Sequence, residues 1–127
     1  LNLSGRTAIP VGARAELALS AAGQTTFGDP VFRSEQFTLE GYDGLSSFVG
    51  GETAVDAGLV GRAELSTFAI VRSKGRQRAI FAPYVFGAFG AGRIEQPTAV
   101  ERGTIDAWNT GAGLRASLFD RIDLRIE

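Results

Sequence analysis

ARAELALSAAGQ, residues 13–24, decides the fold because its side chains change character at every second position. Apolar side chains occupy the odd positions from 13 to 21, whereas Arg14, Glu16 and Ser20 occupy even positions. This two-residue period is that of a β-strand with one apolar and one polar face, and a helix would scatter the charges around its circumference. The stretch therefore predicts a half-buried strand.

The same period recurs along the chain, most sharply in RIDLRIE at residues 121–127, where Ile122, Leu124 and Ile126 alternate with charged residues. It is also present in LNLSGRTAI (1–9), GLVGRAEL (58–65) and NTGAGLRASL (109–118). We therefore predict an all-β, antiparallel up-and-down meander with no helix. Its six strands are expected at residues 1–9, 13–24, 54–71, 79–93, 104–118 and 121–127.

The connections between these strands are sorted by length. Short ones, near residues 9–12, 72–78 and 119–120, alternate with long ones at 25–53 and 94–103. Short turns at one end and long loops at the other are typical of outer-membrane barrels, so we predict a partial transmembrane β-barrel. An antiparallel sheet packed on a soluble core has the same alternation, and the pattern alone leaves that alternative open.

Composition excludes several classes of function. The 127 residues contain 13 basic and 14 acidic side chains, so no net field recruits nucleic acid. Cysteine and histidine are both absent, which removes disulfides, the commonest zinc ligands and the usual general base. The uncharged run 79–92 is too short for a membrane-spanning helix and contains Pro83. We expect no enzymatic activity, no cofactor or metal, and no nucleic-acid partner.

Three weaker motifs favour ordinary structural roles. The basic segment RSKGRQR at 72–78 has a composition typical of a solvated turn, which is favoured over a phosphate site. Hydroxyls such as Ser117 lack an activating base. Acidic residues in the long connection have no calcium-loop spacing, which favours a solvated acidic loop; they are Asp29, Glu35, Glu40, Asp43, Glu52 and Asp56.

The alternation also predicts which side chains face lipid. These are the odd positions of 13–21 and 59–65 and the even positions of 108–118 and 122–126. Aromatic residues concentrate toward the predicted strand ends, where interfacial girdles of barrels lie; they are Phe68, Phe81, Tyr84, Phe86, Phe89, Trp108 and Phe119.

Residues 23–48, GQTTFGDPVFRSEQFTLEGYDGLSSF, and the later GLVGRAEL resemble the C-terminal barrel of two-partner secretion transporters, the TpsB family of hemolysin secretion and activation proteins. In that family a strand ending in Gly-Gln leads through an SEQF-L-GG segment into a long loop, which returns through an R-x-E-L strand. The matching residues are Gly23, Gln24, Ser34, Glu35, Gln36, Phe37, Leu39, Gly41, Arg62, Glu64 and Leu65.

The downstream strands carry the same resemblance. APYVFGAFGAG at 82–92 is similar to the family's PY-F-DAG strand, and residues 109–127 are similar to its S-G-GLR strand and the next one. The resemblance implies that residues 1–127 are a fragment of a barrel domain, without its last strand and its periplasmic POTRA domains.

The family further implies that the long connection folds into the barrel lumen. Its tip would be Leu45, Ser46, Ser47 and Phe48, and the lumen wall would include Arg62, Glu64, Ala88 and Arg115. The implied role is export of a secreted TpsA-type protein across the bacterial outer membrane, whose lipid surrounds the barrel. The alternatives are a barrel-assembly protein of the same superfamily and a soluble β-sandwich or lipocalin-like binding module.

The tip and the wall facing it both depart from the family pattern. Ser46 and Ser47 stand where the family has Arg-Gly, and Ala88 stands where its wall has aspartate. We therefore expect neutral hydrogen bonds to hold the tip. Ser46→Arg alone is expected to leave a cation without its usual partner, with Glu64 on the returning strand as a partial substitute, and Ala88→Asp alone to leave an anion without an arginine. The double change is expected to recover what each single change loses.

Overall fold

The computed structural model describes residues 1–39, 45–46, 54–67, 69–72, 78–99, 102–118 and 122–127. Within these ranges the only helical segment is one 3-10 turn, and no helix is long and apolar enough to cross a membrane. The elements are β1 (Asn2–Val11), β2 (Ala15–Gln24), η1 (Arg33–Glu35), β3 (Phe37–Thr38), β4 (Ala54–Val55), β5 (Ala57–Thr67), β6 (Ala69–Arg72), β7 (Arg78–Arg93), β8 (Thr104–Leu118) and β9 (Ile122–Ile126).

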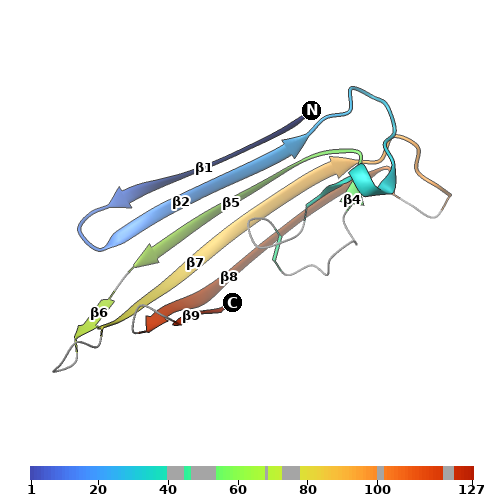
Figure 1. The fold of residues 1–127 in the computed structure, drawn as a ribbon. Helices are drawn as coiled ribbons and strands as arrows, with labels where there is room; N and C mark the ends of the chain where they lie inside the picture. The colour runs from blue at the N-terminus through green and yellow to red at the C-terminus, as the bar shows by residue number, and fades with distance from the viewer. Residues whose placement is uncertain (40–44, 47–53, 68, 73–77, 100–101, 119–121) are drawn as a thin grey trace.

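The strands form one antiparallel meander. The main sheet has the order β1-β2-β5-β7-β8-β9, and β6 pairs with β7 beyond the end of β5. Figure 1 shows these strands side by side in a single layer, with the β2–β5 and β7–β8 connections at the same end. The predicted all-β up-and-down architecture is confirmed.

Two strand boundaries differ from the predicted ones. Residues 12–14 form a turn in which Gly12 has a φ of 72°, so β2 begins at Ala15 rather than at residue 13. Residues 54–55 do not extend β5; they pair with Phe37–Thr38 in a separate two-stranded sheet. Asp56 separates β4 from β5. Its side chain accepts hydrogen bonds from the surrounding connections.

One face of the main sheet is apolar and exposed. Phe89 and Trp108 are direct partners across β7 and β8, and their side chains are 51% and 70% exposed. The register adds further exposed side chains to this face, namely Leu19, Leu59, Leu65, Val85, Leu114, Leu124 and Ile126. The alternation thus predicted correctly which residues share this face.

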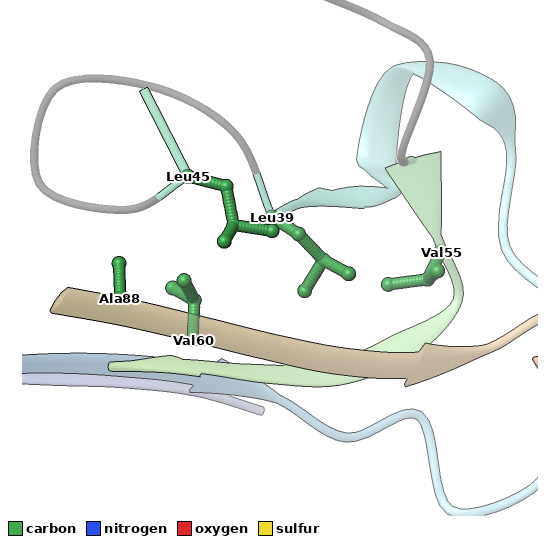
Figure 2. Packing of buried hydrophobic residues seen from close by; sticks show 5 residues of the cluster. All are labelled: Leu39, Leu45, Val55, Val60 and Ala88. Carbon is green, nitrogen blue, oxygen red and sulfur yellow. The ribbon is translucent and has the colours of Figure 1, made fainter. Parts of the chain in front are cut away.

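The opposite face, called the covered face below, carries the core. Leu39, Leu45 and Val55 of the long connection are 0% exposed and pack with Val60 of β5 and Ala88 of β7. Figure 2 shows these five side chains gathered between the connection and the sheet. Through Leu39, Leu45 and Val55 the connection therefore folds back onto the sheet, as the family resemblance implied.

Two glycines of β7 make this close approach possible. A Cβ at Gly92 would lie 2.6 Å from a methyl carbon of Val55, and one at Gly90 would lie 3.0 Å from Leu45. Real Cβ atoms do not approach other atoms so closely without displacement of one of them. The glycines thus form the floor on which the apolar residues of the connection rest.

We expect Gly92→Ala to lower the free energy of unfolding by ~1–3 kcal/mol, because the added methyl group overpacks the contact with Val55. Gly87→Ala is the matched control, since a Cβ there meets nothing nearer than Thr110 at 3.8 Å. Val55→Ala in the Gly92→Ala background should recover part of the loss. Urea unfolding in detergent micelles measures all four proteins; equal effects at the two glycines would contradict the packing.

Candidate functional site: a charged cluster on the covered face

Strand register brings charged residues together on the covered face. Arg62 of β5 lies opposite Ala88 of β7, which in turn lies opposite Asn109 of β8. Two residues further along β5, Glu64 lies opposite Phe86. Arg115 of β8 lies opposite Arg125 of β9. Because side chains two residues apart share a face, four strands contribute to one cluster.

Glu64 is the centre of the ion pairs in this cluster. Its Oε2 lies 3.6 Å from Nη2 of Arg62 and 3.8 Å from Nη2 of Arg125, and its Oε1 contacts Nη2 of Arg115. The side chains of Arg62 and Glu64 are only 4% and 6% exposed. Charges so deeply buried are tolerated only when they are paired, so the ion pairs of Arg62 and Glu64 are needed to offset their burial.

Glu127 supplies the second carboxylate. Arg62 donates to both of its oxygens, over 3.3 Å from Nη1 and 2.9 Å from Nη2. Nη2 of Arg125 donates over 2.7 Å and the hydroxyl of Tyr84 over 2.9 Å. A bidentate guanidinium–carboxylate pair is among the stronger hydrogen-bonded arrangements in proteins.

Two aromatic rings form the base of the cluster. The guanidinium carbon of Arg62 lies 3.6 Å from the ring centroid of Phe86, and that of Arg115 lies 4.7 Å from that of Tyr84. Glycines opposite the rings leave room for them: a Cβ at Gly111 would lie 2.7 Å from Phe86. Cation–π contacts of this kind add to the pairing of buried arginines.

The predicted aromatic girdle is therefore wrong for two of its members. Tyr84 and Phe86 are 3% and 7% exposed and belong to the covered face, because their even positions in β7 alternate with exposed Val85. Phe89 and Trp108 lie on the exposed face. Phe68 and Phe119 are outside the described residues.

The predicted loop tip and wall meet at Ser46. Its hydroxyl accepts hydrogen bonds from Nη1 of Arg62 over 3.4 Å and from Nδ2 of Asn109 over 3.3 Å, and it donates to the carboxylate of Glu127. Leu45 belongs to the apolar cluster that includes Ala88. Ser47 and Phe48 are outside the described residues.

Two expectations about the tip are thus wrong. Ser46 is held by charged partners rather than by neutral hydrogen bonds, because both Arg62 and Glu127 reach it. An aspartate at position 88 would not lack a cation either, since Arg62 is the register partner of Ala88. A pattern within one loop does not reveal which wall charges the neighbouring strands bring to it.

A second polar centre, Asp56, connects the two long connections. Its carboxylate, on a residue only 2% exposed, accepts from the backbone N–H of Glu95 over 2.8 Å, from Nε2 of Gln36 over 3.2 Å and from the N–H of Val31 over 3.4 Å. Burial raises the pKa of this carboxyl, but these three hydrogen bonds outweigh burial and leave the pKa below 3.8.

Gln24 ties Asp56 to the end of β2. Its Nε2 donates to the backbone oxygens of Glu35 over 2.9 Å and of Asp56 over 3.1 Å. Gln24, Glu35 and Gln36 are among the residues that carry the family resemblance, yet the sequence did not predict that they meet Asp56. Among the described residues no group of acidic side chains is arranged to hold a metal ion, and these include Asp29, Glu35 and Asp56.

The sequence also missed Tyr84, Asn109 and Glu127 as members of the charged cluster, and it placed Arg125 only as one charged residue of the polar face. Alternation places each of them on a face, but only the register across β7, β8 and β9 brings them near Arg62 and Glu64. What the assembled cluster offers is fixed charges and hydrogen-bond donors on one face of a sheet.

Comparison with protein-family models, with curated proteins and with solved structures found no match.

Proposed function

We propose that this chain forms part of a bacterial outer-membrane pore that exports a secreted partner protein, as in two-partner secretion. The observation that carries the proposal is the difference between the two faces of the sheet. One face exposes Leu59, Phe89 and Trp108, whereas the other carries the charged cluster. Alternation of apolar and polar residues along antiparallel strands is the signature of transmembrane barrels, whose outer surface contacts lipid.

The covered face supports the assignment of a lumen. It carries both signs of charge, Leu39, Leu45 and Val55 of the β2–β5 connection pack on it, and Ser46 contacts Arg62. A channel wall of fixed, mutually paired charges allows passage of a polar polypeptide without nucleotide or cofactor. The proposed partners are therefore a secreted TpsA-type protein and the lipid of the outer membrane.

The exposed apolar face weighs against the soluble alternatives. In a β-sandwich or lipocalin-like module, such a face is covered by a second sheet or closed around a core. Within the described residues no element packs on Phe89 and Trp108, which remain half or more exposed. A contiguous apolar patch of this kind marks a surface made for lipid or a partner.

Secretion by the complete protein tests the proposal. The gene that contains this chain is expressed with a candidate exported protein of the TpsA type, and export is measured with and without residues 58–93. We expect export to stop. Immunoblots of outer-membrane fractions check that other barrels keep their normal levels. Normal export without the segment ends the proposal. If export continues but the levels of other barrels fall, the result supports the barrel-assembly alternative.

The assignment of the lipid face makes a second prediction. Leu114→Arg should lower the free energy of unfolding in detergent micelles by ~2–4 kcal/mol, because an arginine near the membrane midplane is poorly solvated. Ser117→Arg, on the covered face opposite Asp123, should cost far less. Ser20 is a poorer control, because it lies between Arg6 and Arg62 in the register. Equal penalties at 114 and 117 would contradict the assignment.

A further inference from the structure

A groove lies on the exposed apolar face where β1, β2 and β5 run side by side (Figure 1). Its volume is ≈ 570 Å³. In the register Leu3 of β1 lies opposite Gly23 of β2, which lies opposite Leu59 of β5. A large, a small and a large residue thus follow one another across the sheet. Leucines form the walls of the groove and small residues its floor: Leu1, Leu3, Leu59, Gly5, Ala21 and Gly23.

The lining offers few hydrogen-bonding side chains. Of the lining residues, all of which the structure describes, Thr25 carries the one polar side chain on this face, and its Oγ1 accepts from the backbone N–H of Phe27 over 3.3 Å. Ser4 and Gln24 occupy even positions, so their side chains belong to the covered face, where Gln24 donates to two backbone oxygens. A peptide here would bury N–H and C=O groups without partners, whereas hydrocarbon has none to satisfy.

The dimensions of the groove suit one acyl chain. The strand from Leu1 to Gly5 spans ~13 Å at about 3.3 Å per residue. The volume of ≈ 570 Å³ lies within the range of ~300–1,000 Å³ for pockets that bind small organic ligands. The leucine walls are exposed, so the groove opens onto the apolar face, which continues with Leu19 and Leu65. A guest with a second hydrocarbon chain can therefore lie in the groove and on the face beside it.

We propose that this groove holds one acyl chain of a two-chain phospholipid, whose second chain lies against the neighbouring apolar face. The acyl chain removes the exposed leucine walls from other contacts, and burial of apolar surface is favourable. The groove opens to the side that the proposed function assigns to the membrane. Naming the outer membrane as the source of the lipid rests on the proposed function; the preference of the groove for an acyl chain does not.

Native mass spectrometry of the chain, released from dodecyl maltoside micelles that contain dipalmitoyl phosphatidylcholine, tests the groove. We expect one phospholipid molecule to be retained. Gly5→Leu should weaken its retention roughly tenfold, as the loss of about two buried methylene groups would. A Cβ at Gly5 would meet no described atom within 4 Å, so the new side chain fills the groove without displacing the fold.

The matched control is Gly87→Leu. Gly87 shares the apolar face with Val85 and Phe89 but does not line the groove, and a Cβ there meets nothing nearer than Thr110 at 3.8 Å. This variant adds the same apolar side chain to the same face and should retain the lipid as the wild-type chain does. Equal loss of lipid in the two glycine variants overturns the proposal.

A second pair of variants removes bulk instead of adding it. Leu3→Ala takes away part of one wall and should weaken retention roughly fivefold, because the acyl chain loses apolar contact. Leu65→Ala, the same change outside the groove, should have no effect. If neither alanine variant alters retention while Gly5→Leu does, the leucine walls do not hold the guest and the proposal is overturned.

The remaining outcomes also decide. Absence of a retained lipid, or a dimer of the chain in its place, overturns the proposal. Palmitic acid added at equal concentration separates the sources of the acyl chain: retention of the phospholipid supports the proposal, and retention of palmitic acid alone overturns the assignment to a two-chain lipid. Normal export without residues 58–93, with the phospholipid still retained by the intact chain, ends the proposed function and leaves the groove standing.

Discussion

Replacing Arg62 by methionine is expected to lower the free energy of unfolding by about 3–5 kcal/mol, the largest effect of any single change considered. Arg62 is paired with Glu64 and Glu127 and rests on the ring of Phe86. Without it, Glu64 keeps its contacts with Arg115 and Arg125 but loses one of its three cationic partners. The side chain of Glu64 is only 6% exposed, so water does not replace that partner. The loss follows from a buried carboxylate left incompletely paired.

The matched control for this change is Arg33→Met, because Arg33 is exposed and outside the cluster. Arg62→Met combined with Glu64→Gln should be more stable than Arg62→Met alone, since the second change removes the poorly paired charge. Urea titration in micelles measures each protein. If Arg62→Met lowers the free energy of unfolding no more than Arg33→Met does, the buried pairing does not stabilise the fold. If the effects of Arg62→Met and Glu64→Gln are strictly additive in the double variant, Arg62 and Glu64 are not coupled.

Asp56→Asn is expected to lower the free energy of unfolding by roughly 3 kcal/mol and to release the long connection from the sheet. The N–H of Val31 bonds Oδ1 and the N–H of Glu95 bonds Oδ2. Asparagine keeps one acceptor oxygen, so its NH2 group replaces the acceptor of one of these two N–H groups with a donor. The chain has no cysteine, so Ser46→Cys can report release through a faster reaction with maleimide. Asp29→Asn, at an exposed position of the same connection, is the control.

The same carboxylate gives the stability a dependence on pH. The pKa of Asp56 is lower in the folded state than its ordinary value of 3.8. Its contribution is therefore complete above pH 3.8 and is lost as the pH falls through the lower folded-state value. Wild-type protein should lose stability on acidification from pH 5 to pH 3 more steeply than Asp56→Asn, and parallel pH profiles would contradict this role.

The sequence by itself determined the strands and their two faces. Leu124 and Ile126 alternate with charged Arg125, and only an extended strand places the first two on one side and the third on the other. The alternation therefore specified the strands and the common face of Leu114 and Trp108, within a single strand. The return of the long connection to the sheet was implied only by the family resemblance, and the contacts of Leu45 with Gly90 and of Val55 with Gly92 are known from the structure.

Only the tertiary structure decided which charges meet. Arg62 and Glu127 are separated by 65 positions, and whether they touch depends on how far each strand is shifted against the next, which side-chain alternation within one strand leaves undetermined. Asp56 is similar: its hydrogen bonds come from two connections whose approach is set by the packing of Val55 on Gly92. Side-chain period is a local property and can be read from sequence, whereas register and loop docking depend on contacts between distant segments.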